Sequence, residues 1–160
     1  MSLEIERKFL VRNDDWRREA DGGTTILQGY ICTSDGRAVR VRQAGERGTI
    51  CIKISPDETR AGVSVREEYQ YEIPPEDCRS LLQSACRGRI IRKVRYRVPR
   101  GDLVWEIDVF AGDNAGLVIA EVELDAADRE IELPDWVGKE VTSDPRYLNV
   151  NLAVRPYRDW

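Results

Sequence analysis

Apolar and polar residues alternate along most of this chain, and turn-forming residues separate the alternating stretches. Alternate residues of a strand point to opposite faces of a sheet, so each stretch predicts a half-buried strand. The pattern predicts eight strands, over residues 3–11, 27–33, 37–43, 49–54, 64–73, 90–98, 103–110 and 117–124. Segments rich in Gly, Pro and Asp predict the turns of antiparallel hairpins, at residues 34–36, 45–48, 56–62, 99–102 and 112–116.

Helical spacing of apolar residues occurs in three shorter stretches. Residues 75–86 open with Pro75 and place Cys78, Leu81 and Leu82 on one stripe, while residues 134–140 and 145–154 predict shorter helices. A long antiparallel series with few helices predicts the α+β class, here an eight-stranded antiparallel β-barrel or tunnel with a few flanking helices. The 160 residues contain no linker or repeat, so we expect a single domain over residues 1–160.

The polar face of seven predicted strands carries an unusual amount of charge. In the first strand Glu4, Glu6 and Lys8 share the face opposite to Ile5 and Phe9. Acidic positions recur in the seventh and eighth strands and basic ones in the third, fourth and sixth: Glu106, Asp108, Glu121 and Glu123 against Arg40, Arg42, Lys53, Lys93 and Arg95. An ordinary sheet with one solvated face also alternates, but such a face usually mixes in Ser and Thr. Closure with the charged face inward would place acids in one sector and bases in another.

A closed lumen with two such sectors needs a ligand that satisfies both, because unpaired buried charge is very costly. Carboxylates bind hard divalent cations, and Mg²⁺ is commonly held by carboxylates together with substrate phosphates. Arg and Lys match phosphate oxygens. The combined pattern predicts a metal-bound polyphosphate as the ligand.

Composition removes several classes of chemistry. The chain has no His, which excludes His-based triads and the commonest transition-metal ligand. Its 25 Lys and Arg against 29 Asp and Glu give a net charge of -4, so there is no global basic field for nucleic acid or an anionic membrane. The four cysteines form no CxxC pair and are expected to be reduced and buried. The N-terminus is charged and has no apolar leader, so we expect a cytoplasmic protein.

The order of short motifs resembles that of the CYTH superfamily, the triphosphate tunnel metalloenzymes. Glu4-Ile5-Glu6-Arg7-Lys8 is similar to the ExExK signature of that family, and the likeness continues along the whole chain. The later matches are Gln28-Gly29-Tyr30, Arg40-Val41-Arg42, residues 49–53, 66–72, 93–96 and 105–108, Glu121-Val122-Glu123, residues 138–141 and residues 144–149. The short one-domain form is similar to the bacterial members that act as inorganic tripolyphosphatases.

The resemblance implies roles for individual residues of an eight-stranded tunnel. It implies metal ligands at Glu4, Glu6, Glu121 and Glu123, with Glu68 and Asp108 near the metal, and substrate-binding groups at Lys8, Arg40, Arg42, Lys53, Lys93, Arg95 and Lys139. Lys139 is expected to reach in from a short helix. Lys8 and Tyr30 match a catalytic pair of some short members, in which the ammonium would lower the tyrosine pKa. Relatives often carry a second acid in the fifth strand where this chain has Gln70.

The resulting hypothesis is metal-dependent hydrolysis of the terminal phosphoanhydride of inorganic triphosphate, with Mg²⁺ or Mn²⁺ as cofactor. Its partners are a small-molecule triphosphate and neither nucleic acid nor membrane; the oligomeric state is open, with a homodimer as one alternative. Other activities of the same fold are hydrolysis of thiamine triphosphate or nucleoside triphosphates, and adenylate cyclisation of the class IV type. The alternative from another class is a non-catalytic polyphosphate- or nucleotide-binding module. RNA binding is disfavoured by the acidic balance and by the scarcity of clustered aromatic residues.

Overall fold

The protein was analysed as a computed structural model that describes residues 2–54 and 64–160, so the predicted turn at residues 56–62 lies outside the described residues. Within the described chain, nine antiparallel strands form one sheet in the order β5-β4-β3-β2-β6-β7-β8-β1-β9. The strands are β1 (Ser2–Val11), β2 (Thr24–Ser34), β3 (Arg37–Ala44), β4 (Arg47–Ile54), β5 (Ser64–Ile73), β6 (Ile90–Arg100), β7 (Leu103–Ala111), β8 (Val118–Glu123) and β9 (Val137–Glu140). The eight strands predicted from alternation are all present, and the antiparallel tunnel is confirmed.

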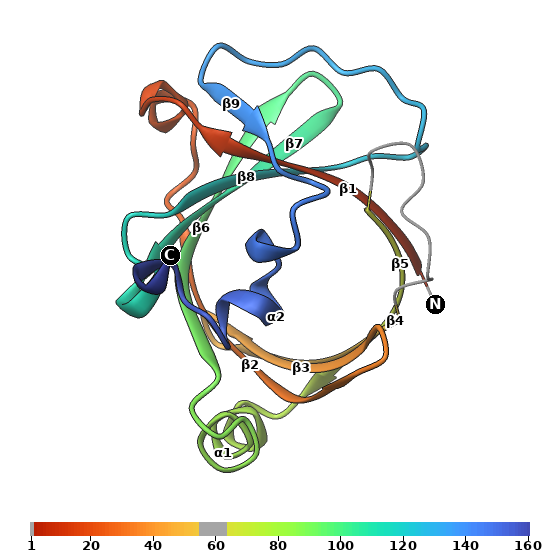
Figure 1. The fold of residues 1–160 in the computed structure, drawn as a ribbon, viewed down its shortest axis with the longest axis vertical. Coiled ribbons are helices and arrows are strands. Elements are labelled where there is room, and N and C mark those ends of the chain that lie inside the picture. Colours follow the sequence, from red (N-terminus) through yellow and green to blue (C-terminus); the bar gives the residue numbers. More distant parts are fainter. Residues whose placement is uncertain (1, 55–63) are drawn as a thin grey trace.

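The sheet closes into a ring because β1 has strands on both of its edges (Figure 1). Ser2–Glu6 pairs with Ser64–Glu68 of β5, and Glu6–Leu10 pairs with Ile119–Glu123 of β8. The end of β1 pairs with β9 on the edge that β5 leaves free. The ring therefore has eight strands, and β9 extends it beside β1.

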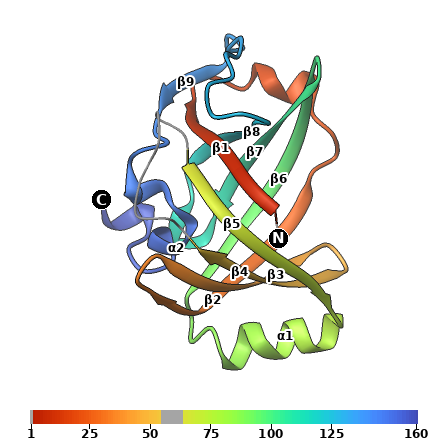
Figure 2. The same cartoon turned by 90° about the vertical axis from the view of Figure 1, so that its right-hand side faces the viewer.

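Two helices and several 3₁₀ turns complete the fold. The helices are α1 (Pro75–Ser84) and α2 (Asn149–Leu152), and the 3₁₀ turns are η1 (Asp15–Arg18), η2 (Gly112–Asn114), η3 (Pro145–Tyr147) and η4 (Tyr157–Asp159). α1 begins at the proline that predicted it and lies outside the ring against β3 and β4 (Figure 2). None of the helices in the described part of the chain is long and apolar enough to span a membrane.

Much of the apolar core lies outside the ring, on the faces that point away from the lumen. Trp105 packs between Phe9 and Trp136, with ring centroids 5.6 and 5.4 Å apart, beneath the segment that leads to β9. A second cluster joins α1 to the outer face of β3. Gly48 allows the close approach of α1, because a Cβ at this position would stand 2.7 Å from Cys78 Cβ.

A third cluster fills one end of the lumen. The inward row of each of four strands changes from a charged residue to an apolar one two positions away, toward the same end of the lumen: Lys8 to Leu10, Lys93 to Ile91, Asp108 to Phe110 and Glu121 to Ile119. These apolar side chains pack with Tyr147 of η3 and Leu152 of α2. Figure 1 accordingly shows α2 within the ring. One end of the lumen is thus filled with apolar side chains, and the charged side chains line the rest of it.

Three expectations need correction. Residues 137–140 form strand β9 and not part of a helix, because they add to the free edge of β1. The helix expected over residues 145–154 is broken into η3 and the single turn of α2. Cys32 is exposed although Cys51, Cys78 and Cys86 are buried.

The exposure of Cys32 follows from a β-bulge in β2. Tyr30 pairs with Arg40, whereas Cys32 pairs with Val39, so Ile31 is an extra residue. The bulge reverses the alternation of the strand, because an inserted residue shifts every later side chain to the other face. Tyr30 and Thr33 therefore both line the lumen.

Candidate functional site: a charged tunnel

A cavity of about 960 Å³ occupies the ring. Its lining includes nine acidic and nine basic side chains among the described residues: Glu4, Glu6, Asp35, Glu68, Asp102, Glu106, Glu121, Glu123 and Asp125, and Lys8, Arg37, Arg40, Arg42, Lys53, Arg66, Arg95, Arg97 and Arg129. Leu148 to Asn151 line it from the α2 side. The lumen is therefore polar, as the alternation predicts for a closed sheet.

Strand order separates the two signs of charge around the ring. The acidic strands β7, β8 and β1 are consecutive neighbours. The basic strands β4, β3 and β6 are also grouped, with only β2 between β3 and β6. β5 joins the two groups and carries both Arg66 and Glu68 into the cavity. The two sectors expected from the sequence therefore exist in the closed ring.

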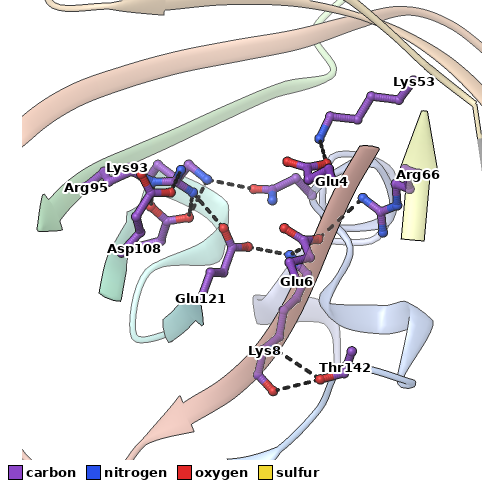
Figure 3. Close-up of polar contacts among 12 residues, drawn as sticks. Glu4, Glu6, Lys8, Lys53, Arg66, Lys93, Arg95, Asp108, Glu121 and Thr142 are labelled. Carbon is purple, nitrogen blue, oxygen red and sulfur yellow. Dashed lines mark hydrogen bonds and ion pairs between the residues drawn. The ribbon is translucent and has the colours of Figure 1, made fainter. Parts of the chain in front are cut away.

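Lysines hold most of the carboxylates of the acidic sector (Figure 3). Lys8 Nζ contacts Glu121 and lies 3.1 Å from Glu6 Oε1. Lys53 Nζ lies 2.5 Å from Glu4 Oε2 and 2.9 Å from Glu68 Oε2. Burial disfavours the ammonium of Lys8, but Glu121 and Glu6 outweigh burial and raise its pKa. Lys8 is therefore a fixed cation in this protein.

The acidic sector nevertheless has more negative charge than its lysines neutralise. The pKa of Glu123 is raised by burial and then by Glu4 and Glu106, and the pKa of Glu4 is raised by burial and then by Glu6. These directions mean that a further cation would be favoured here.

The donor set fits a hard divalent cation, since it consists of carboxylates from three neighbouring strands. In the described part of the chain no group of three or more Asp, Glu or Cys side chains is arranged to hold an ion by itself. The repulsion between the acids favours a bound cation, whereas the lack of a ready-made cluster does not. Both are explained if Lys8 and Lys53 draw the carboxylates apart and phosphate oxygens of a ligand complete the coordination.

The basic sector shows the opposite shortage. Burial, followed by Arg40 and Arg95, lowers the pKa of Arg42 to about 10. Arg40 is buried, and its Nε has no hydrogen-bond partner among the described residues. Its guanidinium reaches Gln70 Oε1 at 3.4 Å and Glu68 Oε1 only at 3.8 Å. An anion with several oxygens would satisfy these groups.

Lys93 and Arg95 extend the basic sector toward the packed end of the lumen. Arg95 binds Asp108 through Nε and a terminal nitrogen, both at 2.7 Å, and Glu121 at 2.8 Å. Lys93 lies 2.5 Å from Asp108 and 3.2 Å from Asn149 of α2. Burial lowers the pKa of Lys93 to about 8 although Asp108 opposes this shift. Asp108 thus supports Lys93 and Arg95 from a fully buried position.

Lys8 and Tyr30, the predicted pair, each contact other residues. Tyr30 Oη accepts a hydrogen bond of 3.1 Å from Gln28, and no hydrogen bond links Lys8 to Tyr30 among the described residues. The pKa of Tyr30 is raised by burial, although nearby cations oppose this. Tyr30 is therefore a protonated phenol at neutral pH.

The ring brings together most of the residues singled out from the sequence. Glu4, Glu6, Lys8, Tyr30, Arg40, Arg42, Lys53, Glu68, Arg95, Glu121 and Glu123 all line the cavity. Lys93 and Asp108 are buried in the wall behind it. Lys139 lies on strand β9 and not on the expected short helix, and it is exposed and not among the cavity residues.

Sequence reasoning missed three residues of the site. Arg66 lines the cavity 3.6 Å from Glu6, and its place on the inward row of β5 was a usable signal. Gln28 is fully buried between Arg42 and Tyr30, but a neutral residue attracts no attention in a charge pattern. Asn149 enters through α2, and nothing in the alternation of the strands indicates this position.

Comparison with known proteins agrees with this geometry. The family model of the CYTH domain matches residues 2–157. The chain is 42% identical over 160 residues to an inorganic triphosphatase of Acetivibrio thermocellus, covering 100% of this chain and 99% of the relative. It is 39% identical over 158 residues to an inorganic triphosphatase of Nitrosomonas europaea, covering 94% and 97%. A crystal structure of an inorganic triphosphatase superposes with a TM-score of 0.64 at 35% identity, covering 96% of each chain.

Proposed function

The chain belongs to the CYTH domain family, and from this premise we propose that it is a metal-dependent hydrolase that cleaves the terminal phosphoanhydride bond of inorganic triphosphate. The observation that carries the proposal is the division of one cavity into an acidic sector, in which Glu4 and Glu123 are short of cations, and a basic sector, in which Arg40 and Arg42 are short of anions. A polyphosphate with its metal supplies both. The names of the two relatives support inorganic triphosphate as the substrate.

Binding of the phosphate chain is assigned to the basic sector. Arg40 and Arg42 project side by side from β3 and need an anion, while Lys53 and Arg95 flank them from β4 and β6. Guanidinium groups bind phosphate through two parallel hydrogen bonds, which fixes the orientation of the chain as well as its position. Lys93 supports this row from the wall, where Asn149 and Asp108 hold it.

Metal binding is assigned to Glu4, Glu6, Glu68, Glu121 and Glu123, with Mg²⁺ or Mn²⁺ as the ion. Bound there, a divalent ion would neutralise phosphate charge and orient a phosphate oxygen. The lysines that now contact these carboxylates would turn to the phosphates. Lys53 is suited to this exchange, since it lies within 3 Å of both Glu4 and Glu68 at the border of the two sectors.

The protein's part in the reaction is positioning and charge stabilisation. Water attacks the terminal phosphorus in line with the leaving pyrophosphate, and the arginines hold the reacting groups in that alignment. Lys8, which stays protonated, stabilises negative charge that develops on the phosphoryl oxygens. Tyr30 acts as a protonated donor, because burial raises its pKa away from that of a tyrosinate base.

The lining of the cavity favours inorganic triphosphate over organic triphosphates. Tyr30 is the only aromatic residue among the described cavity residues, and its hydroxyl is engaged by Gln28. Recognition of a nucleobase or a thiamine ring usually needs a stacking surface. A non-catalytic binding module is disfavoured because mutually repelling acids contribute nothing to binding a polyanion without a metal.

A panel of substrates tests the proposal. Phosphate release is measured with tripolyphosphate, pyrophosphate, ATP and thiamine triphosphate, each with Mg²⁺, Mn²⁺ or EDTA, for the parent and for Arg42→Gln. Glu132→Gln, a change at an exposed residue outside the cavity, is the matched control. We expect tripolyphosphate to be preferred, activity only with metal, and a raised KM in Arg42→Gln alone. A preference for ATP, or equal rates in EDTA, would overturn the assignment.

A further inference from the structure

A fully buried glutamine links an arginine to a tyrosine in the wall of the tunnel. Gln28 and Tyr30 lie two residues apart on β2, so both point into the lumen. Arg42 stands opposite Gln28 in the register of β2 and β3. Arg42 Nε donates to Gln28 Oε1 at 3.1 Å, and Gln28 Nε2 donates to Tyr30 Oη, also at 3.1 Å.

The direction of these hydrogen bonds is fixed by chemistry. A guanidinium has only donors, so the atom of Gln28 that faces Arg42 must be the amide oxygen. The amide nitrogen then faces Tyr30, and because an NH₂ group can only donate, the phenol oxygen must accept. Tyr30 therefore keeps its single proton for another partner.

Within residues 2–54 and 64–160, no acceptor lies within hydrogen-bond reach of this proton. The charged groups that act most strongly on Tyr30 are Arg40, Arg42, Lys8 and Arg66, all of which are cations. Among the described residues no hydrogen bond is donated by the Tyr30 hydroxyl. Tyr30 lies just before the β-bulge, lines the cavity and is 7% exposed. The proton is thus available to an anion held by the arginines.

We propose that Gln28 is a positioning residue: it relays the fixed donor direction of Arg42 to Tyr30, so that the Tyr30 hydroxyl donates its hydrogen bond to an oxygen of the bound polyphosphate. This inference rests on the proposed function, since it assigns a donor within the same site. Gln28 itself does not reach the reacting atoms, because both of its polar atoms are engaged by protein groups.

Gln28→Glu reverses the direction of the hydrogen bond to Tyr30 and hardly changes the shape of the side chain. A carboxylate beside Arg42 stays ionised and accepts from both neighbours, so Tyr30 must donate to it and loses its hydrogen bond to the ligand. We expect kcat to fall by roughly 10²-fold, the loss typical of one positioned proton donor. Gln70→Glu is the matched control, since it places the same charge beside Arg40, whose guanidinium lies 3.4 Å from Gln70 Oε1, and it leaves the relay intact.

A double variant tests whether Gln28 acts on kcat through Tyr30. Tyr30→Phe should lower kcat as much as Gln28→Glu, and the double variant should be no slower than either single variant. Gln28→Glu and Gln70→Glu should share the same rise in KM, because both repel the polyanion. Additive losses of kcat, a parental kcat in Gln28→Glu or in Tyr30→Phe, or an equal loss of kcat in Gln70→Glu would overturn the inference.

A spectroscopic measurement on the ligand-free protein separates this inference from the proposed function. The tyrosine Fermi doublet in ultraviolet resonance Raman spectra distinguishes a phenol that accepts a hydrogen bond from one that donates. The difference between the parent and Tyr30→Phe should show an accepting phenol, and the same difference in the Gln28→Glu background should show a donating one. Identical difference spectra would overturn the relay even if the triphosphatase activity is found. A parent without activity but with the expected spectra would refute only the proposed function. Near-ultraviolet circular dichroism verifies that each variant is folded.

Discussion

Lys53 Nζ lies 2.5 Å from Glu4 Oε2, and this contact joins β4 to β1 across the intervening strand β5. One member comes from the basic sector and the other from the acidic sector. The tunnel therefore satisfies part of its charge internally, at the border where the sectors meet. Removal of one charge at this border or near it should change turnover and thermal stability independently of each other.

Glu4→Gln should raise the melting temperature and abolish most turnover. Burial and then Glu6 raise the pKa of Glu4, so its ionised form costs stability at pH 7. Loss of a carboxylate should lower activity at limiting Mg²⁺ by at least about 10-fold, since even groups that only support metal ligands are worth that much. Thermal unfolding and phosphate release measure the two effects.

Glu6→Gln provides the contrast. Burial would raise the pKa of Glu6, but Lys8, Arg66 and Lys53 together outweigh burial and the net shift is downward, so its charge stabilises the fold. We expect this variant to lose turnover as well and to melt at a lower temperature than the parent. Full activity of both variants at low Mg²⁺ would contradict the assignment of these carboxylates to the metal.

Glu68→Gln should reduce stability at neutral pH but not at strongly acidic pH. Burial would raise the pKa of Glu68, but Lys53 and Arg40 outweigh burial and lower it to about 2, against 4.5 for an ordinary Glu. The ionised form therefore stabilises the fold above about pH 4.5, and this contribution disappears as the pH falls toward 2. Thermal unfolding from pH 7 to 2 should show the difference from the parent shrinking. A difference that is constant with pH would contradict the ion pair.

Tripolyphosphate should raise the melting temperature even with EDTA present. It neutralises Arg40 and Arg42, whose charges repel each other in the basic sector. The increase should shrink with salt and be smaller in Arg42→Gln. A thermal shift assay over a range of ligand and NaCl concentrations measures this. No increase at millimolar ligand and low salt would mean that the sector does not bind phosphate.

Lys139→Ala should change neither kcat nor KM. The residue matches a family motif, but it is exposed on β9 and absent from the cavity lining. Steady-state kinetics with tripolyphosphate, run beside Arg40→Gln as a variant expected to raise KM, measures the difference. A rise in KM for Lys139→Ala comparable to that for Arg40→Gln would place Lys139 at the ligand.

The ring and its two sectors could be predicted because alternation is a strong local signal. Glu4, Glu6 and Lys8 alternate with apolar residues in one strand, and the same design recurs along the chain. The charged rows of β1, β3, β4, β6, β7 and β8 followed from that pattern, whereas Tyr30 and the roles of the residues followed from the family resemblance. Charge alone did not find Gln28, whose importance lies in two hydrogen bonds that depend on the register of β2 against β3.

Features that depend on tertiary contacts could not be predicted from the sequence. Four residues at 137–140 are too few to establish a period of two, and only the free edge of β1 makes them a strand. The bulge at Ile31 shifts one face of β2 and exposes Cys32, which no alternation within the strand indicates. The packed end of the lumen depends on rows that change from charge to apolar character, where Lys8 leads to Leu10.

With a metal present, this tunnel should hydrolyse the terminal bond of tripolyphosphate. Phosphorus-31 NMR of tripolyphosphate incubated with the protein tests it most directly, with Mg²⁺ in one sample and EDTA in the other. Cleavage of the terminal bond should give equal amounts of orthophosphate and pyrophosphate with Mg²⁺, and tripolyphosphate should stay unchanged with EDTA. Tripolyphosphate that remains intact in the presence of both Mg²⁺ and the protein would contradict it.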